Sequence, residues 1–390
     1  MIVAIGGIDG YIGWALALHL AVRGHKVVGI DNFITRKRVE EVGSWSATPI
    51  LTMQERIKAA KEVLGVDIQF VEGDLVNYSV VRSFFEKYKP DAFVHLAEQR
   101  SAPYSMIDVY HAVETQTQNI ASSLNIVYAM KEVSPHTHLV KMGTMGEYGT
   151  PNIDIPEGFF EVEYHGRKDY LPFPRMASSW YHWSKVHDSG NMMFANKIWG
   201  LKISDVMQGV VYGTRTNEIV DERLHTRFDF DEVWGTALNR FCVQTVLGLP
   251  MTVYGKGGQT RGFISLTDSV QCLRLIIENP PDKGEYRVFN QFDEPYSVLE
   301  LAQKVYKVGK EMGFEPAIAH VPNPRVEAES HYYNPEHEKL KALGFKRTRE
   351  LEEELRNMLR DLSRYKNRLE AKKDVIFPRT DWRRARNPVR

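Results

Sequence analysis

Short apolar runs alternate with amphipathic stretches through the first half of the chain. Apolar runs bounded by polar residues predict strands, and apolar positions at helical spacing predict helices. The predicted strands cover residues 2–5, 26–30, 68–71, 92–96, 138–142 and 201–206, and the predicted helices cover residues 11–23, 53–64, 79–87, 107–131 and 178–197. Strict alternation of this kind is typical of an α/β fold in which helices cover a doubly wound parallel sheet.

The pattern becomes less regular in the second half and predicts a smaller α/β substrate-binding domain. Helices are expected at 232–247, 266–278 and 297–312, strands at 251–254 and 286–290, and further helical residues at 349–373. We assign residues 1–208 to a nucleotide-binding domain, to which part of 255–290 returns. Residues 209–254 and 291–375 form the second domain, and residues 376–390 form a basic tail that is solvated or contacts another subunit.

Two segments are longer than ordinary connections. Residues 35–66 carry one good helical pattern and are interpreted as an insertion after the second strand. Residues 150–176 are rich in proline, glycine and aromatic residues, which predicts a long ordered loop. Loops of that length in compact domains are commonly functional.

The composition restricts the possible partners. Lys and Arg together number 50, as do Asp and Glu, so no net charge favours nucleic acid or an anionic membrane as a partner. The two cysteines, Cys242 and Cys272, lie in apolar helical patterns, which indicates buried thiols in a reducing compartment. No targeting segment or long apolar run is evident. We therefore expect a cytoplasmic protein.

A glycine fingerprint follows the first predicted strand. Gly7, Gly10 and Gly13 stand three residues apart at the start of a helix, which suits a tight turn, the close approach of a pyrophosphate and close helix–strand packing. Asp31, at the end of the second strand, is the expected acceptor of a ribose 2′-hydroxyl and favours NAD over NADP, although it could also cap a helix. The pattern predicts a Rossmann-type NAD site.

Further residues around this fingerprint are predicted to contact NAD. Asp74 follows the third strand, where it is either an adenine contact or a turn residue. Arg36, close behind Asp31, carries a charge that could also suit a phosphate. The whole predicted cofactor set comprises Gly7, Gly10, Tyr11, Ile12, Gly13, Asp31, Asn32, Arg36, Asp74, Leu75, Leu96, Asn119, Tyr181 and Lys185.

Tyr181 and Lys185 are the predicted centre of the chemistry. Four residues apart in a helical stretch, they share one face of the helix. A lysine cation lowers the pKa of a nearby phenol, which would let Tyr181 take the proton of a sugar hydroxyl as hydride leaves the same carbon. Thr144, at the end of the fifth strand, would be the hydroxyl partner of the substrate oxygen. Without the glycine fingerprint, such a pair would be an ordinary helix surface pair.

Several long strings give the chain a specific resemblance. They occupy residues 98–106, 145–154, 181–188, 208–213, 235–244, 253–262 and 322–329, beginning with the string EQRSAPYSM. On these strings the chain resembles the extended short-chain dehydrogenases that modify nucleotide sugars and, more narrowly, the UDP-sulfoquinovose synthase family. The resemblance implies that UDP-glucose and sulfite, or a sulfite donor, give UDP-sulfoquinovose and water. It implies transient NAD-dependent oxidation at C4, loss of the 6-hydroxyl, sulfite addition at C6 and re-reduction.

One departure from related dehydratases bears on the C5 and C6 chemistry. Those enzymes follow the catalytic threonine with an Asp–Glu pair, whereas this chain has Met145 and Gly146. The group that removes the C5 proton and the group that protonates the 6-hydroxyl are therefore open. His182 and Glu147 are our candidates.

The resemblance also implies how the substrate is held. Arg261 and Arg325 match diphosphate-binding positions, and planar guanidinium groups suit that role. Arg100 is a candidate contact for the sugar or sulfite, and Tyr254 for the uracil, although it could equally be a core tyrosine. The whole predicted substrate set comprises Arg100, Thr144, Gln208, Tyr254, Gln259, Arg261 and Arg325.

Other functions remain alternatives at this stage. A UDP-glucose 4-epimerase, or another NAD-dependent nucleotide-sugar epimerase or dehydratase, would share the fold and the catalytic residues. An NAD-binding sensor would not need Thr144, Tyr181 and Lys185. No cluster of residues at metal-ligand spacing is evident, so no metal site is expected. Related enzymes pair through two long helices, and residues 107–131 and 178–197 could form a homodimer or a higher homo-oligomer.

Overall fold

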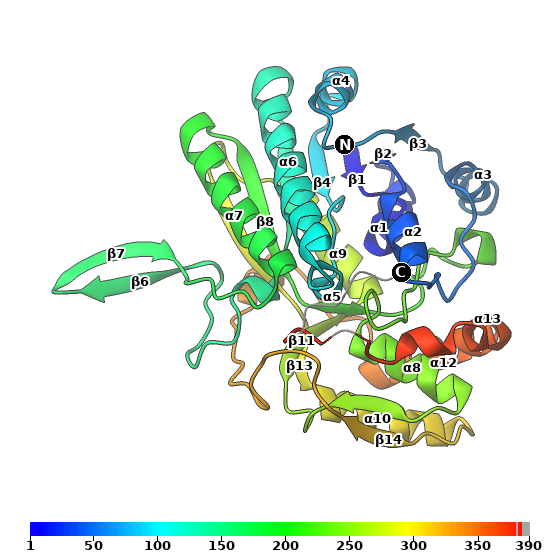
Figure 1. The fold of residues 1–390 in the computed structure, drawn as a ribbon. Coiled ribbons are helices and arrows are strands. Elements are labelled where there is room, and N and C mark those ends of the chain that lie inside the picture. Colours follow the sequence, from blue (N-terminus) through cyan, green and yellow to red (C-terminus); the bar gives the residue numbers. More distant parts are fainter. Residues whose placement is uncertain (380, 384–390) are drawn as a thin grey trace.

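A seven-stranded parallel sheet lies at the centre of the computed structural model, which describes residues 1–379 and 381–383 (Figure 1). The strand order is β12-β8-β5-β4-β1-β2-β3. The strands are β1 (Ile2–Gly6), β2 (Lys26–Asp31), β3 (Ile68–Glu72), β4 (Ala92–His95), β5 (His138–Thr144), β8 (Lys202–Gln208) and β12 (Tyr286–Gln291). The chain runs outward from β1 in both directions, so the order reverses between β1 and β4. This confirms the predicted doubly wound, Rossmann-type fold.

Helices cover both faces of this sheet. On one face, α6 packs between α4 and α7, and on the other α1 packs against α9 (Figure 1). These helices are α1 (Tyr11–Ala21), α4 (Tyr78–Tyr88), α6 (Val109–Val133), α7 (Trp180–Trp199) and α9 (Leu266–Glu278). Successive residues of β1 supply the two cores, since Val3 packs with the α1 side and Ala4 with the α4 side. Both faces of a parallel sheet are buried in this way.

The two long segments contain more structure than expected. Residues 35–66 were predicted to hold one helix, but α2 (Ile34–Glu41) precedes α3 (Met53–Leu64). The helix α2 buries only Arg38 and Val39, so its sequence has no apolar repeat from which a helix could be predicted.

The prediction of a loop at 150–176 was wrong in part. A hairpin of β6 (Phe159–Tyr164) and β7 (Arg167–Pro172) projects from the body of the molecule (Figure 1). Its two turn residues, His165 and Gly166, both have positive φ angles, as short hairpin turns require. Its strands are mostly exposed. The sequence FFEVEY of β6 does alternate apolar and acidic residues, a strand signal that the prediction overlooked, whereas RKDYLP of β7 has no such alternation.

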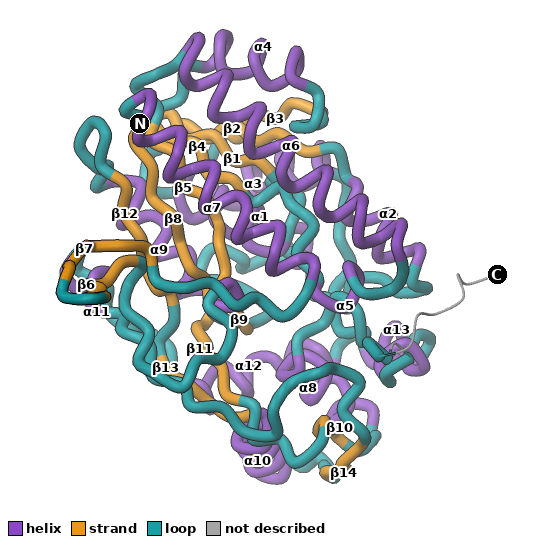
Figure 2. The backbone as a smooth tube through the Cα atoms, turned by 60° about the vertical axis from the view of Figure 1, so that its left-hand side comes forward, coloured by secondary structure: helices purple, strands orange, loops and turns teal. Residues whose placement is uncertain are grey.

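The rest of the chain forms a second lobe below the sheet in Figure 2. Its core contains Phe241, Leu301 and Leu355. The lobe includes α8 (Ala237–Leu247), β10 (Met251–Tyr254), α10 (Val298–Glu311), β14 (Ile318–Val321), α12 (Leu351–Ser363) and α13 (Lys366–Glu370). The helix expected from residue 232 starts later, because the side chain of Thr236 caps it.

Three strands lie between the sheet and this lobe. They are β9 (Val210–Tyr212), β11 (Thr260–Ser265) and β13 (Glu294–Ser297), and the short helices α5 (Ala102–Ser105) and α11 (Glu338–Ala342) complete the fold. After β11 the chain runs through α9 into β12, an edge strand of the main sheet. The predicted domain boundaries stay a prediction.

Two further observations concern the described residues alone. Within 1–379 and 381–383, no helix has both the length and the apolar character needed to cross a membrane. Of the basic tail predicted at 376–390, residues 380 and 384–390 lie outside the described part, including Arg384, Arg386 and Arg390.

Candidate active site

A cavity of about 500 Å³ opens at the carboxyl ends of β1, β4, β5 and β8, between the sheet and the second lobe. Ligands of open α/β sheets bind at this edge, where the strand order reverses. Every residue predicted to contact cofactor or substrate or to take part in the chemistry lines the cavity, with the exception of Arg36 and Glu147. Their individual roles remain proposals.

The glycine turn packs too closely against neighbouring backbone to accept side chains at Gly7 and Gly13. Gly7 has a φ of 84°, and a Cβ atom there would lie 2.7 Å from the main-chain oxygen of Leu96. A Cβ atom on Gly13 would lie 2.2 Å from the oxygen of Gly7. No side chain caps α1, which begins at Tyr11, so its first N–H groups are available to an anion. The turn therefore fits the pyrophosphate of a dinucleotide.

Asp31 closes the opposite end of this turn. Its Oδ2 accepts a hydrogen bond from the Asp9 N–H at 2.9 Å and its Oδ1 accepts one from Phe33 at 2.8 Å. Burial, with the nearby Asp9 carboxylate, raises the pKa of Asp31 to about 6. The Asp31 carboxylate disfavours an additional phosphate on the ribose.

The prediction that Arg36 contacts the cofactor stays a prediction. Its guanidinium binds the Asp9 carboxylate at 2.6 and 2.8 Å, and Asp9 lines the cavity whereas Arg36 does not. The fully buried Arg56 also donates to Asp9, at 2.9 Å. Sequence reasoning missed Asp9, although it lies inside the glycine fingerprint. Asp74 lines the cavity and also accepts a hydrogen bond from Val76 N–H, so it is a turn residue at the site.

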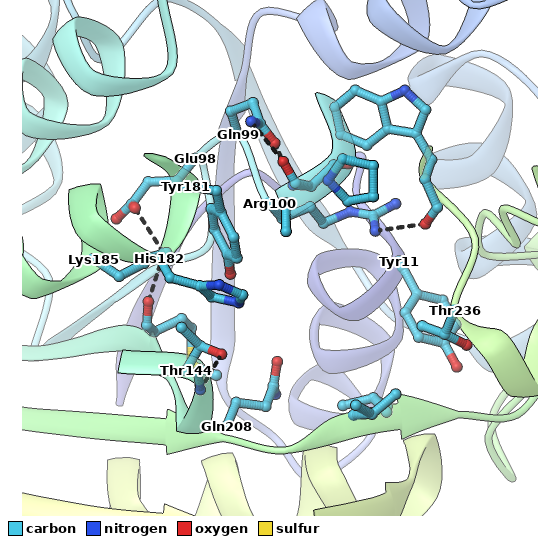
Figure 3. A pocket seen from close by; sticks show the side chains of 18 of the residues that line it. Tyr11, Glu98, Gln99, Arg100, Thr144, Tyr181, His182, Lys185, Gln208 and Thr236 are labelled. Atoms are coloured by element: carbon cyan, nitrogen blue, oxygen red, sulfur yellow. Dashed lines mark hydrogen bonds and ion pairs between the residues drawn. The ribbon is translucent and has the colours of Figure 1, made fainter. Parts of the chain in front are cut away.

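Tyr181, Lys185 and Thr144 meet in the cavity (Figure 3). Ser179 caps α7 and thereby fixes where the helix that carries Tyr181 and Lys185 begins. Lys185 Nζ lies 2.6 Å from the Met142 oxygen and 2.6 Å from Glu98 Oε2. Burial raises the pKa of Tyr181, and Lys185 opposes that shift in the expected direction. Burial is the larger influence in the protein alone.

Glu147 does not line the cavity, and its predicted catalytic role stays a prediction. Its side chain is fully buried, 2.6 Å from Arg175 and 3.2 Å from Lys141. The physical reason is local. Thr144 caps the short 3-10 helix η1 (Met145–Glu147), and that turn directs Glu147 back beneath β5.

His182 does line the cavity. Its Nδ1 lies 3.0 Å from Ser179 Oγ, and a Cβ atom on Gly146 would lie 2.4 Å from its Nε2. Burial lowers the pKa of His182 to about 3, and the cations Arg261 and Arg325 act in the same direction. The ring is therefore neutral near pH 7 and has one unprotonated nitrogen, which is a weaker base than that of an ordinary imidazole.

The far end of the cavity collects cations and polar groups. Arg261 donates to Glu327 at 3.0 Å, and the guanidinium of Arg325 lies 5.4 Å from the Trp382 ring centroid. Gln259 is buried, and neither its oxygen nor its nitrogen has a hydrogen-bond partner. Buried polar atoms normally have partners, so a polar ligand is expected there. Tyr254 lies 5.1 Å below the Arg240 guanidinium.

Arg100 is only partly free to bind an anion. Its guanidinium pairs with Asp229 and lies 5.5 Å from the Trp234 ring centroid. Sequence reasoning missed Asp229, Trp234 and Trp382, all of which line the cavity, because they come from irregular segments. It also missed Glu98, although the string at 98–106 could have indicated it.

Comparisons with known proteins agree with this geometry. The model of the family described as the NAD dependent epimerase/dehydratase family matches residues 3–290. A UDP-sulfoquinovose synthase of Sulfolobus acidocaldarius is 57% identical over 98% of this chain and 98% of its own length. The chloroplastic UDP-sulfoquinovose synthase of Spinacia oleracea is 50% identical over 98% of this chain and 79% of its own length.

Solved structures share the fold at lower identity. A UDP-glucuronic acid 4-epimerase from Bacillus cereus, in complex with UDP-glucuronic acid and NAD, superposes with a TM-score of 0.70 at 19% identity, covering 93% of this chain and 99% of that one. A Thermus thermophilus UDP-glucose 4-epimerase in complex with NAD gives 0.65 at 21% identity, covering 93% and 99%.

Proposed function

The chain belongs to the NAD dependent epimerase/dehydratase family and, within it, to the UDP-sulfoquinovose synthases, and from this membership we propose that it joins sulfite to C6 of UDP-glucose. It is an enzyme, and its cofactor is NAD. The observation that carries the proposal is the placement of Thr144, Tyr181, Lys185 and His182 around one cavity without an acid pair after Thr144. UDP-sulfoquinovose and water are the products.

The glycine turn and Asp31 are the residues that would hold NAD. When bound there, NAD supplies an acceptor for a hydride from the sugar and later returns it. The open α1 terminus faces the pyrophosphate, and the Asp31 carboxylate accepts a hydrogen bond from a ribose hydroxyl.

Tyr181 acts on the C4 hydroxyl of the sugar. Its phenolate oxygen takes the hydroxyl proton, and the Thr144 hydroxyl donates to the same substrate oxygen. The Lys185 ammonium stabilises the phenolate, which burial alone would disfavour. The same proton returns from Tyr181 when C4 is reduced again.

His182 is the proposed base at C5. Once C4 is a carbonyl, the C5 proton is acidic, and the neutral His182 ring can take it. The electron pair forms the C5–C6 double bond, and the proton passes to the departing 6-hydroxyl, which leaves as water. The sulfite sulfur then bonds to C6, and C5 regains a proton. Enclosure of the cavity keeps water from adding first.

The cations at the far end of the cavity would bind the nucleotide. Arg261 and Arg325 suit the diphosphate, and Tyr254 lies where it can contact the uracil. Gln208 and the unpartnered Gln259 would hydrogen-bond the sugar or the nucleotide. Arg100 is the proposed contact for sulfite, and its ion pair with Asp229 partly neutralises its charge.

A product assay tests the proposal. The purified protein with NAD is incubated with UDP-glucose in the presence and absence of sulfite, and the products are separated by chromatography against UDP-glucose and UDP-galactose standards and identified by mass. We expect a sulfonated nucleotide sugar only with sulfite, and none with Tyr181→Phe. Formation of UDP-galactose in both samples, with no sulfonated product, would instead identify an epimerase.

We also propose a homodimer through α6 and α7. These helices pack side by side and expose Val109, Tyr110 and Val113 on α6, and Phe194 and Ile198 on α7. An exposed apolar surface of this kind is a common feature of subunit interfaces. Phe194→Glu should give a monomer in analytical ultracentrifugation, and an unchanged mass would exclude this interface.

A cytoplasmic location is supported by two free, buried cysteines.

A further inference from the structure

Glu98 follows β4 and is in direct contact with Lys185. The Glu98 Oε2 lies 2.6 Å from Lys185 Nζ, and its side chain is only 2% exposed (Figure 3). Neither catalytic proton transfer nor substrate binding, as derived above, uses this carboxylate. A buried charge of this kind requires a partner, and here the partner is the lysine of the catalytic set.

The contact restricts the direction of the lysine. An ammonium group has three N–H donors. In Lys185 one contact is the Met142 oxygen at 2.6 Å and another is the Glu98 carboxylate at 2.6 Å. One donor therefore remains for the cavity, where Lys185 and Glu98 both belong to the lining.

A second buried carboxyl group supports Glu98 from behind. Burial raises the pKa of Asp188 well above its ordinary value, and its side chain forms a hydrogen bond with Glu98. Treated as a carboxylate, Asp188 has no donor for either of its oxygens, whereas Glu98 has the Lys185 ammonium. A proton on Asp188 gives it a donor toward the Glu98 carboxylate, because a protonated carboxyl group donates a hydrogen bond.

We propose that Glu98, supported by Asp188, is a positioning residue that holds the Lys185 ammonium in place and offsets its charge beside Tyr181. The carboxylate moderates the influence of the lysine on the phenol, so that Tyr181 both takes the C4 proton and returns it. A reaction that oxidises and then reduces the same carbon requires both directions. The inference rests on the proposed function for this kinetic consequence.

Other charged groups also face Tyr181 and Lys185. They are Asp188 on α7, Lys141 on β5, His95 on β4, Arg100 in the loop after β4 and Glu147 on η1. His95 Nε2 lies 3.1 Å from Glu98 Oε1, and burial lowers the pKa of His95 to about 4, so its ring is neutral. Glu98 is the first of the groups that raise the pKa of Lys185, and it also raises that of Tyr181.

The first experiment requires neither substrate nor turnover. Lys185 is labelled with acetic anhydride over a range of pH in the purified protein, and its modification is followed by mass spectrometry. Glu98→Gln removes the charge and keeps the shape. Because a charge within about 4 Å shifts a pKa by about one unit or more, we expect at least about a tenfold increase in Lys185 reactivity at neutral pH. Reactivity equal to that of the native protein would overturn the proposal.

The second experiment follows the pH profile of kcat for the same variant. Loss of the carboxylate lowers the pKa of Tyr181, so the ascending limb should move to lower pH by about one unit. The KM for UDP-glucose should change less than about twofold. If the ascending limb of the kcat profile stayed at the same pH, the proposed role of Glu98 beside Tyr181 would be overturned. If the native protein made no sulfonated product, only the proposed function would be overturned.

Two further variants separate positioning from folding. Glu98→Asp keeps the charge but shortens the side chain, so we expect native Lys185 reactivity with a lower kcat. An unchanged kcat would contradict positioning, even if Glu98→Gln failed to fold. Glu218→Gln is the matched control, since Glu218 is also buried and pairs with Arg23 at 2.8 Å outside the cavity. It should leave the Lys185 reactivity and the pH profile unchanged.

Discussion

Lys141 Nζ lies 3.2 Å from Glu147 Oε1, and neither side chain is exposed to solvent. Lys141 also lies 3.1 Å from Asp205 Oδ1 and donates to Ser189 Oγ at 2.8 Å. The cluster thereby joins β5, η1, α7 and β8 directly beneath the catalytic residues. It explains why an acid only three residues after Thr144 contributes to the framework of the site rather than to its cavity.

Glu147→Gln should therefore reduce stability more than it alters the chemistry. Removal of one partner from a buried ion pair typically costs about 3–5 kcal/mol, because the remaining charge stays buried. Urea unfolding measures the free energy, and kcat is measured on the folded fraction. Glu161→Gln is the control, since its pair with Lys168 at 2.8 Å is exposed and should be worth no more than about 1 kcal/mol. If Glu147→Gln abolished turnover but unfolded with the native free energy, Glu147 would instead take part in the reaction.

Gly146→Ala should disturb His182 specifically. A Cβ atom at position 146 would lie 2.4 Å from His182 Nε2, so the imidazole ring has to move. We expect kcat to fall about 100-fold or more, the range attributed to a general base, with NAD affinity unchanged. Product formation and a binding titration measure the two effects.

Gly190→Ala provides the matched comparison. Gly190 lies on α7, and a Cβ atom there meets no other atom within 4 Å. This variant should gain up to about 1 kcal/mol of helix stability and keep full activity. Equal loss of activity in both variants would show that the His182 contact does not matter.

The parts of the structure that sequence reasoning found were those with a repeating pattern. The central strands, α1 with its glycine turn, and the Tyr181–Lys185 face of α7 follow from local spacing and short-range geometry. The helix α2 was not predicted because polar residues dominate it. The β6–β7 hairpin was not predicted because the proline, glycine and aromatic residues of 150–176 favoured a loop over the short alternation in β6.

The missed site residues had a different cause. Glu98 and Asp188 lie far apart in the sequence, since one follows β4 and the other lies on α7, so no local pattern pairs them. Only the packing of α7 against the central sheet, beside β5, brings them together. The pairing of Arg36 with Asp9 at 2.6 Å was also not evident from the sequence, because the two residues lie on different segments of the chain.

The affinity for NAD should depend on pH through Asp31. Its pKa in the folded protein is about 6, raised from 3.8 by burial and by Asp9. A ribose hydroxyl donates to the ionised carboxylate, so NAD binding is strong above pH 6 and weakens as the pH falls through 6. The decrease should approach about tenfold per pH unit below the pKa.

Isothermal titration at several pH values measures this dependence. Asp31→Asn should bind NAD about 10–100-fold more weakly at pH 7, and its affinity should be nearly independent of pH. The effect on folding has the opposite sign. Between pH 3.8 and 6 the folded protein holds more protons than the unfolded chain, so the contribution of Asp31 to stability decreases as the pH rises through that window. NAD affinity that increased on acidification would contradict this assignment.

Trp382 brings the end of the described chain into the substrate end of the cavity. Its backbone N–H donates to the Pro324 oxygen at 2.9 Å, and the Arg325 guanidinium lies 5.4 Å from its ring centroid. Burial lowers the pKa of Arg325, and the indole ring offsets the loss of solvent by a cation–π contact. Trp382 therefore holds a guanidinium that is proposed to bind the diphosphate.

Trp382→Ala should accordingly raise the KM for UDP-glucose. A cation–π contact of about 0.5–2 kcal/mol corresponds to an increase of about 2–30-fold, while kcat and NAD affinity should stay close to native values. Initial rates at saturating sulfite and NAD measure the effect. Arg383→Ala is the control, because Arg383 is exposed and does not line the cavity. A local contact with Arg325 should affect the binding of UDP-glucose and not that of NAD. If Trp382→Ala weakened the binding of both ligands equally, Trp382 would stabilise the fold of the whole site instead of orienting Arg325.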